Sequence, residues 1–175
     1  MLFEKEIRQL YRQSFPKLER VHFHILKNIV HRKCGKFYPI TINHKFLGFF
    51  FAVKSEKLTY LFFFALKKEV RNKGYGSQAL LKILSKFKDQ KICLLTEMIR
   101  PREKDKIRIR RKNFYLRHHF KESGYFFKEN NVWYEMLCTD DHFIAQDYIK
   151  LMKNAFSKLE YRFFFKPQGY KKIIE

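Results

Sequence analysis

The sequence feature that most constrains the fold is an apolar run that leads into a glycine-containing loop. Residues Leu58–Leu66 are apolar at every position except Thr59, a composition typical of a strand that is covered on both faces. Gly74 and Gly76 follow shortly afterwards and precede apolar residues at helical spacing over 80–87. We therefore expect a central strand, a short loop and an amphipathic helix packed against the sheet.

The rest of the apolar pattern predicts an α+β domain with a mixed, mainly antiparallel sheet. Helical spacing indicates helices near residues 3–14, 18–29, 80–87, 102–118 and 142–157, and shorter apolar runs indicate strands at 37–42, 46–53, 58–66, 91–96, 120–128 and 132–138. The segment from Leu159 onwards has a strand-like aromatic content, but the sequence does not place it. A chain of 175 residues suits one hydrophobic core without disulfides.

The charge balance is strongly basic. The chain carries 38 Lys and Arg against 17 Asp and Glu, a formal net charge of +21, so we expect an electropositive surface that attracts phosphates, acidic proteins or RNA. Hydrophobic residues make up 46% of the chain, which excludes a disordered chain. No apolar run reaches membrane-spanning length and no signal peptide is visible, so we expect a cytoplasmic protein with no membrane partner.

The potential metal ligands are scattered along the chain. Cys34, Cys93 and Cys138 are odd in number and lie far apart, and His22 and His24 would point to different faces of a helix. No acidic or cysteine ligand accompanies the two histidines, so the sequence predicts no metal site.

The loop after the central strand has the chemistry of an anion site. Arg71, Gly74 and Gly76 form an Arg-x-x-Gly-x-Gly pattern at the start of a predicted helix. Glycine lets the backbone approach a ligand, and a helix N-terminus favours negative charge, so a pyrophosphate would fit. The pattern lacks the third glycine of the dinucleotide fingerprint and the Gly-Lys-Ser/Thr of a P-loop. The competing interpretation is an ordinary strand-to-helix turn that uses glycine for its geometry.

This stretch resembles motif A of the GNAT N-acyltransferases. The resemblance covers about residues 4–138 and implies a GNAT fold in which acetyl-CoA (coenzyme A) enters between two splayed strands. Carried over by position, Phe64 and Leu66 would contact the pantetheine arm through backbone groups, and the Leu66 N–H would stabilise the oxyanion. The backbone amides of six loop residues would hold the pyrophosphate: Arg71, Lys73, Gly74, Tyr75, Gly76 and Ser77.

The resemblance also divides the chain. Residues 1–138 would form the N-acetyltransferase domain, and residues 139–175 would add a C-terminal helix and tail, packed on this domain or at a dimer interface. The usual first strand is missing or reduced to 1–3, which would leave a sheet edge to be covered by the tail or by a partner chain. Homodimerisation through the tail is accordingly a hypothesis.

The family's catalytic acid is a helix tyrosine that protonates the leaving thiolate, and two alignments place it differently. In the first, Phe114 and Tyr115 form the family's Phe-Tyr pair, and His119 stands at a usual glycine. In the second, Gly124 stands at the family's usual glycine, and Phe120 stands at the tyrosine position. We favour the first, because it leaves a longer strand for the final hairpin and keeps a phenol that can do acid chemistry. The alternative role for Tyr115 is that of a core aromatic.

Three charged residues are further candidates. Glu97 directly follows a predicted strand, where many family members carry a carboxylate base; otherwise it is a surface carboxylate at a strand end. Glu19 would begin the second helix on the family's substrate side, or would be a first-turn charge that favours the helix dipole. Arg108 belongs to a basic stretch over 100–112. That stretch would contact the 3′-phosphate of the cofactor, RNA or an acidic partner, or form a solvated helix face.

The sequence therefore predicts an enzyme that transfers the acetyl group of acetyl-CoA directly to a primary amine. The acceptor is a small molecule, a peptide or a protein, and the sequence does not identify it, because the loops lining the cleft decide it. The alternative is a non-catalytic acyl-CoA-binding or basic RNA-binding module on the same fold. The net charge of +21 disfavours a polycationic acceptor unless local acidic residues override it.

Overall fold

The fold is built on one seven-stranded sheet. The computed structural model describes residues 1–17, 19–99, 105–129, 131–165 and 169–173. The strands are β1 (Gly35–Ile42), β2 (Lys45–Lys54), β3 (Leu58–Leu66), β4 (Lys91–Glu97), β5 (Lys121–Glu129), β6 (Val132–Cys138) and β7 (Gly169–Lys172). They lie in the order β1-β2-β3-β4-β6-β5-β7, and neighbours are antiparallel except for β3 and β4.

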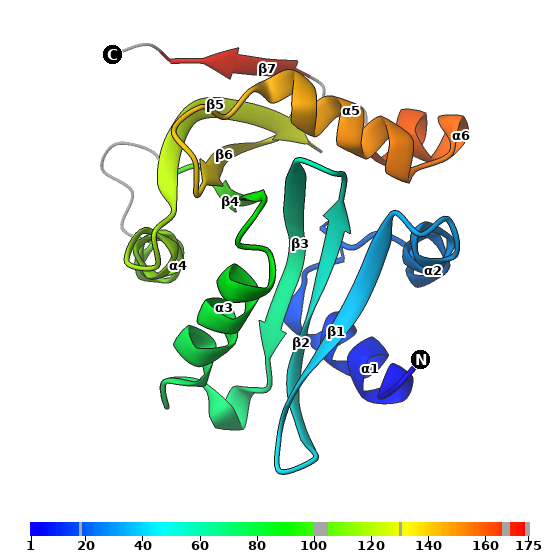
Figure 1. Cartoon of the computed structure of the whole chain (residues 1–175), viewed down its shortest axis with the longest axis vertical. Coiled ribbons are helices and arrows are strands. Elements are labelled where there is room, and N and C mark those ends of the chain that lie inside the picture. The colour runs from blue at the N-terminus through cyan, green and yellow to red at the C-terminus, as the bar shows by residue number, and fades with distance from the viewer. Residues whose placement is uncertain (18, 100–104, 130, 166–168, 174–175) are drawn as a thin grey trace.

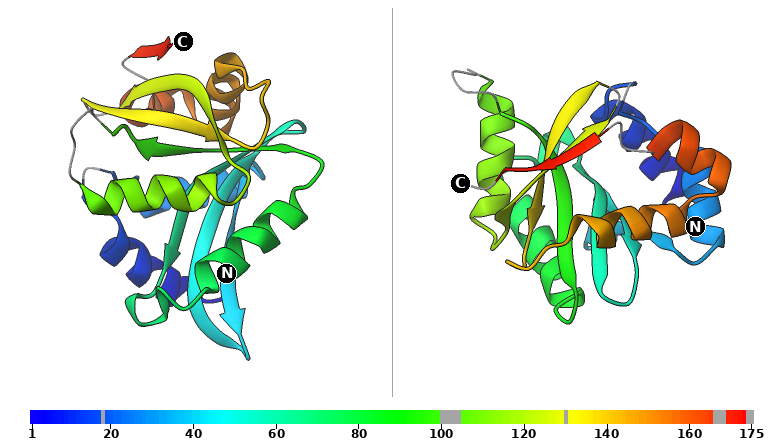
Figure 2. Two further views of the ribbon diagram at one scale, coloured as in Figure 1. Left: turned by 90° about the vertical axis from the view of Figure 1, so that its left-hand side faces the viewer. Right: turned by 90° about the horizontal axis from the view of Figure 1, so that it is seen from above.

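Helices cover both faces of this sheet, as Figure 1 and Figure 2 show. One face carries α1 (Glu4–Ser14), α2 (Phe23–His31) and α5 (Ala145–Ala155), and the other carries α3 (Tyr75–Lys86) and α4 (Lys106–Leu116). A single turn, α6 (Lys158–Glu160), follows α5. Each long helix contributes an apolar stripe; α1, for example, buries Ile7, Leu10 and Tyr11 at helical spacing. None of the helices in the described part of the chain is long and apolar enough to cross a membrane.

Most predicted elements are confirmed, and the mainly antiparallel α+β architecture is correct. The predicted strand at 58–66 coincides with β3. The basic helix is shorter than predicted and begins at Lys106, because the Asp105 carboxylate caps it by accepting the N–H groups of Ile107 (2.9 Å) and Arg108 (3.1 Å). Residues 100–104 of the basic stretch lie outside the described residues.

The second helix begins later than the sequence suggested, at Phe23. Glu19 donates its backbone N–H to the Pro16 carbonyl (3.0 Å), which makes a turn. The Tyr11 hydroxyl of α1 donates to the Val21 carbonyl (2.8 Å) and holds that carbonyl outside a helix. Glu19 therefore lies in the connection between α1 and α2, and the expectation that it begins a helix is wrong.

The parallel strands β3 and β4 pair only at one end. The pairs are Leu58 with Lys91, Thr59 with Ile92, and Tyr60 with Cys93. Beyond these residues the described parts of the two strands no longer pair, and the ribbons separate (Figure 1). We call the space between 61–66 of β3 and 94–97 of β4 the β3–β4 gap. The expected splay of these two strands is thus present.

The segment after β6 shares the core of the domain. Tyr148, Leu151 and Met152 of α5 are buried in the same apolar cluster as Ile7 of α1 and Phe51 of β2. Because α5 covers part of the sheet face, removing it would expose this cluster to water. Helix α5 is therefore a structural part of this fold.

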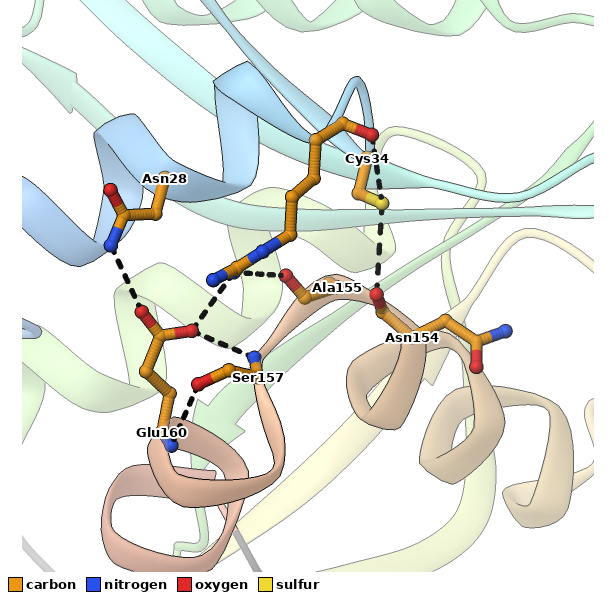
Figure 3. Close-up of polar contacts among 7 residues, drawn as sticks. Asn28, Cys34, Asn154, Ala155, Ser157 and Glu160 are labelled. Carbon is orange, nitrogen blue, oxygen red and sulfur yellow. Dashed lines mark hydrogen bonds and ion pairs between the residues drawn. The ribbon is translucent and has the colours of Figure 1, made fainter.

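Polar contacts also tie the end of α5 and the turn α6 to α2, as Figure 3 shows. The Glu160 carboxylate accepts hydrogen bonds from Asn28 Nδ2 (3.1 Å) and from Arg32 Nη1 (2.9 Å). Arg32 donates in addition to the Ala155 carbonyl (3.3 Å). Ser157 and Glu160 form a reciprocal capping box that fixes the turn.

The last strand, β7, extends the sheet beside β5. The expectation that the tail covers the edge left by a missing first strand is wrong, because β7 lies at the opposite end of the sheet from β1. Without β7, the backbone groups on this side of β5 would form an open edge. Pairing with β7 supplies their hydrogen-bond partners. Among the described residues, no strand precedes α1.

Candidate functional site

The backbone of β3 presents an open edge to the β3–β4 gap. Lys67 donates its N–H to the Leu47 carbonyl (2.9 Å), which fixes the alternation of the β2–β3 ladder. In an antiparallel pair, the backbone N–H and C=O groups of successive residues point alternately toward the partner strand and away from it. Ala65 therefore faces β2, whereas Phe64 and Leu66 direct their backbone polar groups toward the gap. An extended ligand can pair with this edge as an added strand would.

The loop 67–74 leads from this edge into the N-terminus of α3. Asn72 (φ 63°) and Gly74 (φ 80°) adopt left-handed backbone conformations, which at position 74 suits glycine because no Cβ clashes. The first N–H that bonds within α3 is that of Gln78, which donates to the Gly74 carbonyl (3.1 Å). The N–H groups of 75–77 precede it and point out of the helix end. We call 74–77 the anion turn, because such a helix end favours a phosphate.

Basic side chains lie in the loop that leads from β3 to the anion turn. The Arg71 Nε donates to the Leu66 carbonyl (3.0 Å), which places the guanidinium against the end of β3. Lys67, Lys68 and Arg71 also line a groove of about 550 Å³ between this loop and α1, together with Glu6 and Glu69. The structure therefore brings Arg71 and the anion turn to the end of β3 that borders the β3–β4 gap.

Helix α4 covers the gap from the face that also carries α3. The Phe114 ring stacks on the Phe64 ring of β3, with 6.5 Å between the ring centroids. Tyr115 is 9% exposed and packs edge-on against Phe120 at 5.6 Å. Burial raises the pKa of Tyr115 to about 12, and the charge of Arg111 opposes this shift. The Tyr115 phenol therefore stays protonated at neutral pH.

The C-terminal end of α4 distinguishes the two alignments of the catalytic tyrosine. Tyr115 lies in the last turn of α4, whereas Phe120 lies beyond the helix. His119 has a φ of 67°, the left-handed conformation that usually places a glycine after a helix. Gly124 lies within β5, where the pairing with β6 is irregular. The helix thus ends where the alignment that uses Tyr115 places its end, and the role of Tyr115 stays a prediction.

Two arginines of α4 hold Glu97 at the end of β4. Arg108 Nη2 lies 3.0 Å from Glu97 Oε1, and Arg111 Nη1 lies 3.4 Å from Glu97 Oε2. Arg108 Nε also pairs with Asp105 (3.3 Å). The Arg108 guanidinium, which the sequence suggested as a cofactor contact, is therefore directed at Glu97 and fastens α4 to β4.

Glu19 and Tyr134 lie within electrostatic range of Glu97. Tyr134 is opposite Glu97 in the β4–β6 register, so the two side chains share a face of the sheet. Burial raises the pKa of Glu19, the charge of Glu97 raises it further, and the two arginines of α4 oppose this shift. Burial, Glu19, Glu129 and Glu97 together raise the pKa of Tyr134. The connection between α1 and α2 thus reaches the end of β4.

A further carboxylate contributes to the charge around Tyr134. Glu129 of β5 accepts a hydrogen bond from the Tyr148 hydroxyl of α5 (3.3 Å). Burial raises the pKa of Glu129 to about 7, although this hydrogen bond lowers it. The Tyr148 ring packs 5.0 Å from that of Tyr60, the last β3 residue paired with β4. Sequence reasoning missed Glu129, Tyr134 and Tyr148, because they belong to separate elements and no spacing connects them.

His22 and His24, at the start of α2, do not belong to a group of described side chains that could bind a metal ion. The rings of His22 and His24 stack at 5.6 Å. Within the described part of the chain, no three His, Cys, Asp or Glu side chains lie close enough together to hold a metal ion.

The comparison with protein families agrees with this geometry. A family model described as the acetyltransferase (GNAT) family matches residues 4–120. The chain belongs to the GNAT acetyltransferase family. The matched region contains the open edge of β3, the anion turn and Tyr115. None of the curated proteins matches this sequence at a significant level.

Solved GNAT-family structures share the fold. A GNAT-family acetyltransferase from Bacteroides thetaiotaomicron is 25% identical with a TM-score of 0.70, over 92% of this chain and 91% of that one. An acetyltransferase from Bacillus subtilis in complex with CoA is 17% identical with a TM-score of 0.58, over 78% of this chain and 92% of that one. A GNAT acetyltransferase from Elizabethkingia anophelis with acetyl-CoA bound is 15% identical with a TM-score of 0.51, over 73% of this chain and 92% of that one. At these identities the last two show likeness of fold alone.

Proposed function

We propose that this GNAT-family chain transfers the acetyl group of acetyl-CoA directly to a primary amine. The observation that supports this is the meeting of two features at one gap: the open backbone edge of β3, formed by Phe64 and the Leu66 N–H, and the anion turn at 74–77. The Leu66 carbonyl already accepts from Arg71 Nε. An acyl-CoA needs both, because its arm is an extended amide chain and its pyrophosphate is strongly anionic. Two solved structures of similar fold hold CoA or acetyl-CoA.

The proposed reaction is a single displacement without a covalent enzyme intermediate. The neutral amine attacks the thioester carbonyl carbon, the carbon–sulfur bond breaks, and CoA leaves as a thiolate. The Leu66 N–H, on the gap side of β3, is the proposed donor to the oxyanion. Tyr115 is the proposed acid for the thiolate. Its pKa of about 12 means that the phenol is protonated at neutral pH and has a proton to donate.

The acceptor side supports a positively charged amine. Glu19, Glu97 and Glu129 gather there in a chain with a net charge of +21, so this side carries acidic side chains despite the overall charge. Arg108 and Arg111 already engage both oxygens of Glu97. We therefore propose that Glu19 binds the ammonium group and takes its proton, and that the charge of Glu97, the predicted base, tunes Glu19. Burial raises the pKa of Glu19, which makes its carboxylate a better proton acceptor.

Release of CoA from acetyl-CoA in the presence of a panel of amines tests this function. The panel contains monoamines, diamines and peptides with free N-termini, and the acetylated product is identified by its mass. We expect one class of cationic amine to be acetylated and Glu19→Gln to raise its KM at least tenfold. Glu56→Gln, which alters an exposed carboxylate in the turn before β3, is the matched control and should change neither constant.

Two results would contradict these proposals. If no amine is acetylated while RNA binding with sequence preference persists at about 200 mM salt, the chain is a basic binding module and the proposed function is wrong. If acetylation occurs but Glu19→Gln and the control behave alike, the acetyltransferase function stands and the role of Glu19 does not.

A further inference from the structure

A second groove lies on the sheet face that carries α3, at the C-terminal end of that helix. We call it the β1 groove; it has a volume of about 650 Å³, and Tyr38, Ala52, Lys86 and Phe87 are among the residues that line it. Such a volume is in the range of ligand-binding clefts. Helix α3 ends at Lys86, and the small Ala52 of β2 lies opposite Lys36 of β1. The groove is therefore a part of the sheet face that the helix leaves uncovered.

Four lysines from separate parts of the chain line the β1 groove. Lys36 belongs to β1, Lys54 to β2 and Lys86 to α3, and Lys33 follows α2. All four are exposed, and none forms an ion pair with another residue in the part of the chain that the structure describes. Among the described lining residues, Asp89 alone is acidic. Four lysines against one aspartate leave a positive charge that favours an anionic partner.

The Tyr38 ring holds two of these lysines near each other. Lys36 Nζ lies 5.6 Å and Lys86 Nζ lies 5.5 Å from the centroid of this ring, so the two ammonium groups are at most 11.1 Å apart, the sum of these distances. The Phe50 ring stacks on the same ring at 4.4 Å, and Phe87 packs edge-on against it at 5.9 Å. Tyr38 is thus not an open platform for stacking a base, which disfavours single-stranded nucleic acid.

Strand β1 supplies a free backbone edge beside the groove. It is the last strand of the sheet, and no described strand pairs with its outer side. Lys54 donates its N–H to the Cys34 carbonyl (2.9 Å), so every second residue from Cys34 faces β2, whereas Gly35 and Phe37 direct their backbone polar groups outward. Pro39 has no N–H, which limits this edge to a short stretch. An extended polypeptide can pair with such an edge.

We propose that the β1 groove binds an acidic segment of a partner protein in an extended conformation. The segment runs along the outer edge of β1 at Gly35 and Phe37, and its carboxylates lie among the four lysines. The groove and the anion turn lie at opposite ends of α3, a helix of 12 residues, and are therefore about 18 Å apart. Docking of the segment leaves the anion turn open, so this inference does not depend on the proposed function.

Fluorescence anisotropy with a labelled peptide in which glutamate alternates with threonine tests the proposal, at about 150 mM salt. The same peptide with glutamine in place of glutamate, and a labelled oligouridylate, are the comparison probes. A double variant with Lys36→Gln and Lys86→Gln removes the two ammonium groups beside Tyr38. The matched control combines Lys5→Gln and Lys150→Gln, which alter exposed lysines of α1 and α5 on the other sheet face and give the same net charge.

We expect the double variant at Lys36 and Lys86 to bind the acidic peptide about five- to tenfold more weakly than the wild type. The control variant should bind it as the wild type does, and both variants should unfold thermally as the wild type does. The glutamine peptide and the oligouridylate should bind more weakly than the acidic peptide.

Three results would overturn the proposal. Equal losses in the two double variants would mean that the overall charge, rather than this groove, attracts the peptide. An oligouridylate that binds as tightly as the peptide, with the same dependence on Lys36 and Lys86, would mean that the groove takes a nucleic acid. A wild type that does not bind the acidic peptide would exclude the site.

Discussion

Replacing Glu129 by glutamine should make the stability of the protein less dependent on pH. The pKa of Glu129 is about 7 in the folded chain, because burial disfavours its charge, against an ordinary value of 4.5. The folded state therefore holds this proton more tightly than the unfolded state does. Its contribution to stability is complete below about pH 4.5 and is lost as the pH rises through about 7.

The size of the effect follows from the two pKa values. At about 1.4 kcal/mol for each pH unit, the difference corresponds to about 3 kcal/mol above pH 8. Glutamine resembles the protonated carboxyl and can still accept the hydrogen bond from Tyr148. Glu129→Gln and the wild type should therefore be equally stable near pH 4, and the variant should be more stable by about 3 kcal/mol at pH 8.

Urea unfolding between pH 4 and pH 8 measures this difference directly. Glu56→Gln, at an exposed carboxylate, serves as the control and should follow the wild type throughout. Parallel stability curves for Glu129→Gln and the wild type would refute the argument, because they would mean that Glu129 ionises in the folded chain as it does in water.

Two further substitutions test the site. Tyr115→Phe should lower kcat more than tenfold and leave the affinity for CoA nearly unchanged, as measured by steady-state kinetics and calorimetry; an unchanged kcat would exclude the acid role. Gly74→Ala should cost about 1 kcal/mol of stability, because its φ is 80°, and should weaken CoA binding. Gly169→Ala, where an added Cβ meets nothing within 4 Å, is the matched control, and equal behaviour of the two variants would contradict this argument.

The strands were predictable because their apolar runs are continuous or alternate strictly. The bounds of β3 coincide with the predicted ones, since no polar residue other than Thr59 interrupts them. The start of the second helix was not predictable from spacing. Val21 is buried and fits the apolar pattern, but a long-range hydrogen bond from Tyr11 to its carbonyl holds it outside the helix.

The loop of the proposed cofactor site was predictable from the sequence, and the proposed acceptor side only in part. The anion turn is a local feature, since its glycine and the helix that follows are adjacent in sequence. Glu19, Tyr134 and Glu129 come together only because the α1–α2 connection and the β5–β6 hairpin meet near the end of β4. A single sequence carries no signal for such a meeting of distant segments.

Thermal unfolding with acetyl-CoA, CoA and ATP in parallel, at about 150 mM salt, tests the central claim most directly. A ligand that binds only the folded state stabilises it by about 2.7 kcal/mol at a hundredfold excess over its Kd. We expect both CoA species to raise the unfolding temperature and ATP to leave it unchanged. Equal rises with all three ligands would mean that the basic surface merely collects phosphates, and no rise with either CoA species would contradict an acyl-CoA site in the β3–β4 gap.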